Sequence, residues 1–458
     1  FTKRGEEVTP VPKILMIAYY FPPLGGGGVP RPLKFCKYLP EFGWDVVVLT
    51  AKNGVGPVYD KTLLDELNSY KNVKVYRTIS FELGALKNLF KKIFFDNSNT
   101  KNQSAPIERQ EKKYREIKTQ KKGYLKRIFS KCYDLLFKLQ KFLCAPDDKI
   151  LWAIPSFFFA LRIIKKEKPD MIFVTLPPYS SFILAVLLKK FLGVKLITDY
   201  RDPWNTEFDK KGINYLIEKW CLKNCDGYVY AVEQINQWLL KLYNIRNIQT
   251  ELITNGYDED DYKNIEPIKF DKWTMISGGD LYGEENIYFF KILEEFLSEN
   301  SEIKNNFQLI ICSNKQKWFE DYLKHSQIKE NIINLGILPK KEYLRYVAGA
   351  DCACIFTYAY YNTSNQIQLH GRVFDYLVLN KKLLVIGKEE KNNTLLNFLK
   401  MNDFNFIFSG QENKQDIKEK LYFIFRNSNN LKIENKNIEK YSRKELTKKL
   451  NEYLRNIL

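Results

Sequence analysis

Near the start of this sequence an apolar run, a glycine cluster and an amphipathic pattern follow one another directly. Residues 14–18 are apolar throughout, as in a parallel strand buried on both faces. Pro22, Pro23 and the glycines behind them interrupt regular structure. From Val29 onward, apolar residues recur at three- and four-residue steps beneath a basic face (Leu33, Phe35, Cys36 and Leu39). This order predicts the opening of a βαβ unit, where ligands bind at the carboxyl ends of the strands.

The glycine cluster itself consists of Gly25, Gly26, Gly27 and Gly28. Glycines let the backbone approach a ligand closely, and free N–H groups at the start of the next helix favour an anion. We therefore predict an acceptor- or phosphate-binding loop here. A tight turn without a ligand is the alternative, but the position directly after the first strand favours a site.

A resemblance to a known family begins in the same stretch. Residues 19–50, YYFPPLGGGGVPRPLKFCKYLPEFGWDVVVLT, resemble the amino-terminal signature of bacterial retaining glycosyltransferases of the GT4 type, which have the two-domain GT-B fold. The glycine spacing is not the dinucleotide fingerprint GxGxxG. The strand VVVLT runs into Ala51 and Lys52, without the acidic residue that would bind a ribose. Both differences argue against a nicotinamide enzyme.

The composition limits the class of protein. A length of 458 residues predicts two or three domains, and a net charge of +18 suggests an anionic partner such as nucleic acid, a membrane surface or a phosphorylated substrate. The eight cysteines lack zinc-ligand spacing and indicate buried thiols in a reducing compartment. No apolar stretch reaches the ~20 residues that span a bilayer, and no signal peptide is visible. We expect a cytoplasmic protein, at most peripheral on the inner face of the cell membrane.

Strands and helices alternate along two stretches, 152–243 and 273–386, which predicts two α/β units with mostly parallel sheets. We place a first Rossmann-like domain at 1–257, with a basic insertion at about 80–145, and a second at 258–435. The acidic run 258–267 is interpreted as a linker. The resemblance implies a GT-B architecture of two doubly wound domains facing a cleft. It also implies that a C-terminal helix, 436–458, crosses back to the first domain.

Residues 123–143 form a basic amphipathic pattern inside the insertion. Such a helix can lie on an anionic membrane surface. A helix that packs on the first domain with a solvated outer face is an equally good interpretation.

Residues 371–387, GRVFDYLVLNKKLLVIG, are similar to the donor-binding element of these transferases. The resemblance implies that Arg372 meets the donor diphosphate, that Asp375 holds the ribose hydroxyls, and that His370 and Gly371 lie beside the donor. Guanidinium groups bind phosphate oxygens, and a carboxylate accepts hydrogen bonds from vicinal hydroxyls. The alternative is a surface Arg–Asp pair on an exposed helix.

The turn SGGDLYGEEN, residues 277–286, resembles the glycine-rich turn of the donor domain and adds Gly278 and Gly279 to the predicted donor site. Two positions depart from the family pattern. Glu284 and Glu285 stand where a basic phosphate ligand is usual, and Ile367 stands where the family has a further glutamate. Arg372, Gly279 and Arg201 would then have to neutralise the diphosphate.

The segment ITDYRDPWN, residues 197–205, resembles an RDPW element that faces the cleft in this family. We predict that Asp202 positions an acceptor hydroxyl or acts as its base, and that Arg201 faces phosphate. An aspartate before proline often only caps a turn, which is the structural alternative. No DxD pair is placed to hold a metal, so we expect no metal and no cofactor beyond the nucleotide-sugar substrate.

These features together predict a retaining glycosyltransferase with a nucleotide-diphospho-sugar donor and a lipid-linked or glycan acceptor in bacterial surface-polysaccharide assembly. A GT-B sugar-nucleotide epimerase or hydrolase is the second hypothesis. A non-catalytic protein that binds nucleotide-sugar or nucleic acid is the third, suggested by the charge. The interleaved aromatic and basic motifs of RNA-binding proteins are not seen, so no nucleic acid is expected.

Overall fold

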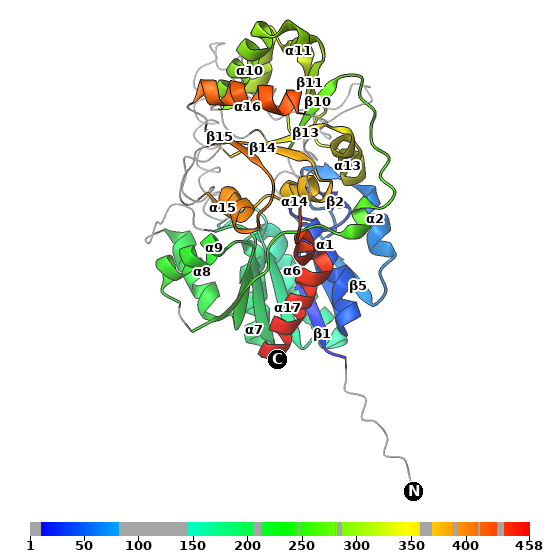
Figure 1. The fold of residues 1–458 in the computed structure, drawn as a ribbon. Helices are drawn as coiled ribbons and strands as arrows, with labels where there is room; N and C mark the ends of the chain where they lie inside the picture. The colour runs from blue at the N-terminus through cyan, green and yellow to red at the C-terminus, as the bar shows by residue number, and fades with distance from the viewer. Residues whose placement is uncertain are drawn as a thin grey trace, which may run out of the picture.

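The computed structural model describes residues 11–81, 145–204, 212–245, 247–279, 281, 286–357, 369–387, 393–410, 413–427 and 435–458. The basic segment 123–143, most of the predicted insertion and the positions Glu284, Glu285 and Ile367 lie outside these residues. Figure 1 shows two α/β domains, the second above the first, joined in the middle of the molecule.

The first domain is built on a seven-stranded parallel sheet with the order β5-β3-β1-β6-β7-β8-β9. Its central strands are buried on both faces, which is why their sequences are apolar without alternation. The strands are β1 (Lys13–Ile17), β3 (Asp45–Ala51), β5 (Val73–Thr78), β6 (Met171–Leu176), β7 (Lys195–Tyr200), β8 (Gly227–Tyr230) and β9 (Gln249–Leu252). A short antiparallel pair, β2 (Leu24–Gly25) with β4 (Val58–Tyr59), holds the start of the glycine loop.

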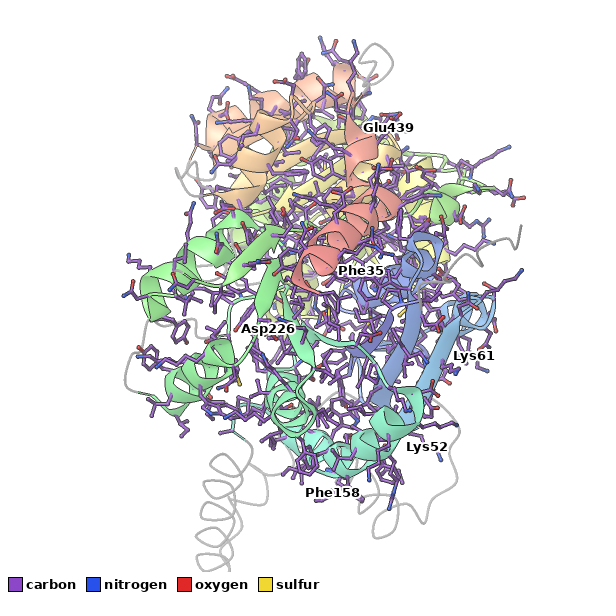
Figure 2. The ribbon with its side chains drawn as sticks, turned by 90° about the horizontal axis from the view of Figure 1, so that it is seen from below. Phe35, Lys52, Lys61, Phe158, Asp226 and Glu439 are labelled. Carbon is purple, nitrogen blue, oxygen red and sulfur yellow. The ribbon has the colours of Figure 1, made fainter. Side chains whose placement is uncertain are left out.

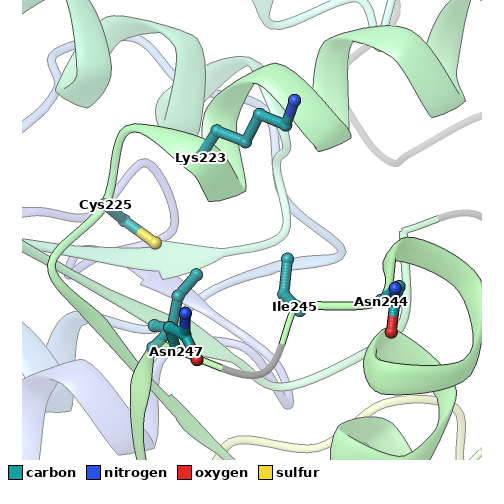
Figure 3. A pocket seen from close by; sticks show the side chains of 6 residues that line it. Lys223, Cys225, Asn244, Ile245 and Asn247 are labelled. Carbon is teal, nitrogen blue, oxygen red and sulfur yellow. The ribbon is translucent and has the colours of Figure 1, made fainter.

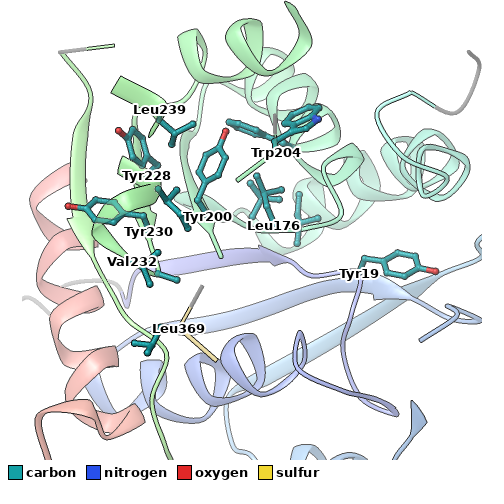
Figure 4. Packing of buried hydrophobic residues seen from close by; sticks show 14 of the residues in the cluster. Tyr19, Leu176, Tyr200, Trp204, Tyr228, Tyr230, Val232, Leu239 and Leu369 are labelled. Carbon is teal, nitrogen blue, oxygen red and sulfur yellow. The ribbon is translucent and has the colours of Figure 1, made fainter. Parts of the chain in front are cut away.

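Helices cover both faces of this sheet, and a separate apolar cluster lies on each face. One cluster packs β1 and β3 against α1 and the C-terminal helix α17, and the other packs the opposite face against α6, α7, α8 and α9. Figure 4 shows part of the second cluster, with Tyr200 and Tyr228 from neighbouring strands. The helices are α1 (Pro30–Tyr38), α2 (Lys61–Asn68), α6 (Ile150–Glu167), α7 (Ser180–Leu192), α8 (Ile213–Lys223) and α9 (Glu233–Tyr243), with a 3₁₀ turn η1 (Leu39–Phe42).

The second domain has a six-stranded parallel sheet with the order β12-β11-β10-β13-β14-β15. The sequence predicts five of these strands and misses β15, so the observed sheet is one strand wider. The strands are β10 (Trp273–Gly278), β11 (Phe307–Cys312), β12 (Ile332–Asn334), β13 (Cys352–Phe356), β14 (Lys382–Gly387) and β15 (Ile407–Gly410). The helices are α10 (Ile287–Glu299), α11 (Ser301–Asn305), α12 (Lys317–His325), α13 (Lys340–Gly349), α14 (Gly371–Val378), α15 (Thr394–Met401) and α16 (Lys414–Arg426).

The last helix, α17 (Arg443–Ile457), lies along the first domain (Figure 1), which confirms the predicted crossover. Its apolar side contributes Leu446, Leu450 and Leu454 to the cluster around β1, β3 and α1. At its polar edge, the indole of Trp44 donates a hydrogen bond of 2.8 Å to Asn451. The first domain is therefore completed by residues from the far end of the described chain.

The chain crosses between the domains twice, and the two crossings touch. The N–H of Tyr257 donates to the carbonyl of Tyr441, and the N–H of Arg443 donates to the carbonyl of Tyr257. A Cβ atom on Gly256 would lie 2.0 Å from the carbonyl oxygen of Tyr441, so this close approach requires a glycine. A short 3₁₀ turn, η5 (Ile438–Tyr441), precedes the second crossing.

The acidic run predicted as a plain linker is ordered instead. Asp258 caps the 3₁₀ turn η2 (Glu259–Tyr262) by accepting from the N–H of Asp260. Lysines of α1 bind its carboxylates: Lys34 Nζ lies 2.7 Å from Asp258 and 2.6 Å from Asp261, and Lys37 Nζ lies 2.7 Å from Asp258. The basic face predicted for this helix therefore faces the linker rather than water.

Two further predictions concern the cysteines and the membrane. Six cysteines fall within the described residues, all of them buried thiols without a disulfide (Cys36, Cys221, Cys225, Cys312, Cys352 and Cys354). Burial raises the pKa of these thiols, to about 12 for Cys225 and Cys312. None of the helices in the described part of the chain has the length and apolar character needed to cross a membrane.

Candidate functional site

The glycine loop lies at the carboxyl end of β1, as predicted, and its geometry differs from a standard anion-binding helix start. Gly26 has a φ of +99°, a conformation that side chains rarely adopt, and its carbonyl accepts from the N–H of Val29 at 3.1 Å. Pro30 and Pro32 open α1, so the first turn lacks two of the N–H groups expected there. An anion bound here would depend on the glycine backbone more than on the helix.

Arg201 fastens this loop to the neighbouring strand end. Its guanidinium donates to three carbonyl oxygens: Nε to Leu176 at 2.7 Å, and the two terminal nitrogens to Gly28 and Pro177. A Cβ on Gly28 would meet the Arg201 guanidinium at 2.9 Å, so the glycine makes room for the clamp. These contacts favour a positioning role for Arg201 rather than the predicted contact with phosphate.

A buried ion pair that the sequence analysis did not single out lies directly behind the loop. The guanidinium of Arg31 contacts both carboxylate oxygens of Asp199, at 2.7 to 3.1 Å, and both side chains are at most 1% exposed. Thr175 donates to the same carboxylate at 2.9 Å, and Arg31 also donates to the carbonyl of Thr254 at 2.7 Å. One residue of α1 thus connects β6, β7 and the first crossing.

Asp202 lies at the carboxyl end of β7, beside Arg201 and half-buried. Burial raises the pKa of Asp202, while Arg201 opposes that shift and Asp199 adds to it. The ring of Tyr179 stacks on Trp204 at 4.9 Å, and its hydroxyl donates to the carbonyl of Pro203 at 2.8 Å. The RDPW element is therefore held rigidly, with a carboxyl group whose pKa suits proton transfer better than that of a surface aspartate.

The predicted donor residues meet at the carboxyl end of β10. Arg372, in the first turn of α14, donates to the carbonyl of Gly278, and Gly279 follows with a φ of +79°. The N–H of Gly278 donates to the hydroxyl of Tyr376 at 2.8 Å, and Tyr343 lies 3.1 Å from that hydroxyl. Within the described residues, Nε of Arg372 is buried and has no hydrogen-bond partner.

Asp375 is buried rather than exposed on its helix, which excludes the surface-pair alternative. It is 3% exposed, and its Oδ1 accepts from the hydroxyl of Tyr262 and from Lys340 Nζ at 2.5 Å. Neither partner is evident from the sequence. A ribose would reach this carboxylate through its other oxygen, or after Tyr262 has moved away.

His370 and Gly371 flank these residues at the start of α14. Burial, with a smaller contribution from Arg372, lowers the pKa of His370 to about 3, so the imidazole is neutral at physiological pH. Among the described residues, none has an atom within 4 Å of the place that a Cβ on Gly371 would take.

The turn η2 contacts both parts of the predicted site: the helix after the glycine loop in the first domain, and Asp375 in the second. Asp258 and Asp261 bind Lys34 of the helix that follows the glycine loop, and Tyr262, one residue on, binds Asp375. The carboxylates of Glu66, Asp258 and Asp261 gather closely enough to hold a metal ion, but Lys34 Nζ lies within 2.7 Å of each. The lysine ammonium occupies the place that a cation would take.

A shallow hollow elsewhere on the first domain is lined by Lys223, Cys225, Asn244, Ile245, Asn247 and Ile248 (Figure 3). These residues lie before β8 and β9, at the amino edge of the sheet. The candidate residues lie at the opposite, carboxyl edge. The hollow is therefore separate from the predicted site.

Residues 123–261 match the family model of Glycosyltransferase Family 4. A sequence search of curated proteins found no match. Among solved structures, the chain is similar to Anabaena Alr3699/HepE in complex with UDP-glucose, at 11% identity over 97% of this chain and 99% of that one, with a TM-score of 0.57.

Two further solved structures are similar over the same extent. Sucrose-phosphate synthase from Thermosynechococcus elongatus has 11% identity over 97% of this chain and 94% of that one, with a TM-score of 0.53. A Listeria monocytogenes protein described as a UDP-N-acetylglucosamine 2-epimerase has 10% identity, coverages of 97% and 96%, and a TM-score of 0.51. At such identities these likenesses establish the fold alone. The fold is GT-B, and the match over residues 123–261 supports a glycosyltransferase of the GT4 type.

Proposed function

We propose that this chain is a retaining glycosyltransferase that moves a sugar from a nucleotide-diphospho-sugar to an acceptor bound by the first domain. One observation carries the proposal: Arg372 meets Gly278 and Gly279 at the carboxyl end of β10, and the buried carboxylate of Asp375 lies one turn further along the same helix. They offer a guanidinium for the diphosphate and a carboxylate for the ribose. Similarity to a structure that holds UDP-glucose is consistent with a donor of this class.

The acceptor is proposed to be a lipid-linked or glycan intermediate of bacterial surface-polysaccharide assembly. The glycine loop and Asp202 would face it from the first domain. In the reaction, the bond between the sugar C1 and the diphosphate oxygen breaks and the acceptor oxygen bonds to C1. Asp202 would position the acceptor hydroxyl or take up its proton.

Stabilisation of the leaving diphosphate is the main demand of such a reaction. The guanidinium nitrogens of Arg372 are preorganised donors, and such donors often make the largest contribution to catalysis. We propose that they act without a metal ion.

Binding measurements test the donor site. Thermal-shift screening against UDP-, GDP-, ADP- and dTDP-sugars identifies the base, because stabilisation grows with ligand concentration over Kd. Asp375→Asn and Arg372→Gln should then each weaken binding about 10- to 100-fold in calorimetry, since a hydrogen bond to a charged group contributes roughly 1.5–3 kcal/mol. Asp321→Asn is the matched control, because Asp321 is exposed on α12 and pairs only with Lys324 in the described residues. Unchanged affinity in both site variants refutes the donor site.

Product analysis separates transfer from the other GT-B activities. Transfer with retention gives a glycosylated acceptor whose anomeric configuration by NMR equals that of the donor. Free sugar in quantity without acceptor would indicate a hydrolase. A donor recovered with inverted C2 would indicate an epimerase.

A further inference from the structure

We infer that the outer face of helices α6, α7 and α8 is a docking surface for an anionic lipid bilayer. We call this face the α6–α8 surface and define it by seven exposed apolar side chains (Ile154, Phe158, Phe159, Leu187, Phe191, Ile213 and Leu216). They are 42% to 71% exposed, with Phe158 at 63% and Phe191 at 71%. Large apolar side chains gathered on one face of a protein mark an interaction site, whereas single ones are ordinary.

Side-chain contacts join the three helices that carry this surface. The ring of Phe157 lies 5.6 Å from that of Phe158 and 6.3 Å from that of Phe191, which joins α6 to α7. Lys190 of α7 lies over the ring of Trp220 at 5.0 Å, which joins α7 to α8. Figure 2 shows Phe158 at the outer edge of the molecule, on the teal helix.

The charges on the same helices identify the partner. α6, α7 and α8 contain seven basic residues (Arg162, Lys165, Lys166, Lys189, Lys190, Lys219 and Lys223). Their only two acidic residues, Glu167 and Glu218, are buried at 4% and 0% exposure. Exposed charge on these helices is thus entirely positive, and an apolar face bordered by lysines matches the acyl and headgroup layers of an anionic bilayer.

The position of the α6–α8 surface can be related to the residues proposed to face the acceptor, the glycine loop and Asp202. Asp147, just before α6, accepts hydrogen bonds from the N–H groups of Tyr179 and Ser180 at the start of α7. Both helices therefore begin at the sheet edge that holds the glycine loop and Asp202. A bilayer against their outer face would lie beside the place where a lipid-linked acceptor has to arrive.

Vesicle sedimentation with the full chain tests this inference, and it requires neither donor nor sugar transfer. The parent should sediment with phosphatidylglycerol-containing vesicles at 0.1 M NaCl and much less with pure phosphatidylcholine. Phe158→Ser combined with Phe191→Ser should lower partitioning at least about 10-fold, because two large apolar groups no longer enter the bilayer. Phe423→Ser is the matched control, since Phe423 is a 46%-exposed phenylalanine on α16 of the second domain, and it should bind as the parent does.

Single lysine substitutions separate the electrostatic contribution to vesicle binding from the apolar contribution. Lys165→Gln, Lys166→Gln and Lys190→Gln should each weaken binding about fivefold, which corresponds to ~1 kcal/mol per basic residue near the surface. Lys324→Gln, an exposed lysine of the second domain, is the control. Salt at 1 M should reduce the parent's binding without removing it, because the apolar contribution is not screened.

Four results would overturn the inference. A parent that ignores anionic vesicles at low salt excludes the bilayer as partner. A phenylalanine double variant that converts a dimer into a monomer shows that a second copy covers the surface. A double variant with a lowered melting temperature shows that another segment of the same chain covers it. Vesicle binding that matches the parent in the double variant would place the membrane contact elsewhere.

Discussion

At the scale of single residues, Arg31 forms the buried ion pair that joins α1 to β7. Its charge is buried and satisfied by Asp199 and by the carbonyl of Thr254. Breaking a buried pair leaves one uncompensated charge, which costs more than the pair itself contributes. The sequence shows Arg31 only as one member of a basic face, because its partner lies 168 residues away.

We predict that Arg31→Met lowers the free energy of unfolding by about 3–5 kcal/mol, since Asp199 then remains buried without its hydrogen-bonded guanidinium. Adding Asp199→Asn should recover part of this loss, because an amide can keep the hydrogen bond from Thr175. Arg426→Met, an exposed arginine stacked on Tyr422, should cost ~1 kcal/mol or less. Urea denaturation measures all three, and equal losses for Arg31→Met and Arg426→Met would contradict the role of the pair.

We predict that Asp202 determines the rate of sugar transfer. Asp202→Asn should lower turnover about 100-fold or more, as loss of a general base does, with unchanged donor affinity. Because burial raises its pKa, the parent's rate should fall as pH drops through a value above the usual ~3.9, and the variant should lack this acid limb. Asp271→Asn, an exposed aspartate, serves as control. A variant that transfers sugar at the parent rate would make the RDPW element purely structural.

At the scale of elements, η2 is a charged turn clamped between two lysines of α1. Burial alone would raise the pKa of Asp258, but Lys34 and Lys37 outweigh it and bring the pKa down to about 2. A carboxyl group whose folded pKa is depressed stabilises the folded state above its unfolded pKa. That stabilisation disappears as pH falls through the folded value.

The window for this effect runs from about pH 4 down to pH 2. We predict that the parent loses about 2 kcal/mol of stability across it through Asp258, and that Asp258→Asn is less stable at pH 7 and flatter between pH 4 and 2. Thermal melts at half-unit pH steps would show this, with Asp271→Asn as the control that follows the parent. Parallel curves for parent and Asp258→Asn would contradict the clamp.

The bounds of several helices and strands follow from their local sequence alone. α7 and α8, and the strands β11 and β13, have the bounds that periodicity predicts, because apolar repeats and flanking glycines act within one element. β15 escaped prediction, since its four residues carry no distinctive alternation. The pairing of Tyr262 with Asp375 escaped as well, because it joins residues 113 positions apart that only the fold brings together.

At the scale of the whole molecule, the two domains are coupled rather than strung on a flexible linker. One apolar cluster contains residues of both, including Tyr200 of the first domain and Leu369 and Phe374 of the second. Asn255, at the first crossing, donates to the carbonyl of Leu369 at 3.1 Å. The resemblance implied this two-domain arrangement, but the residues that couple the domains follow from three-dimensional contacts that no motif records.

The position of α17 has a consequence for how the protein is made. Its leucines complete the face of the first sheet, yet they follow β9 by about 190 residues in the chain. At a synthesis rate of about 5–20 residues per second, that interval is roughly 10–40 s. During that time the nascent first domain lacks the helix that covers Trp44, Gly227 and Gln249, so this part of its surface is complete only after α17 has been synthesised.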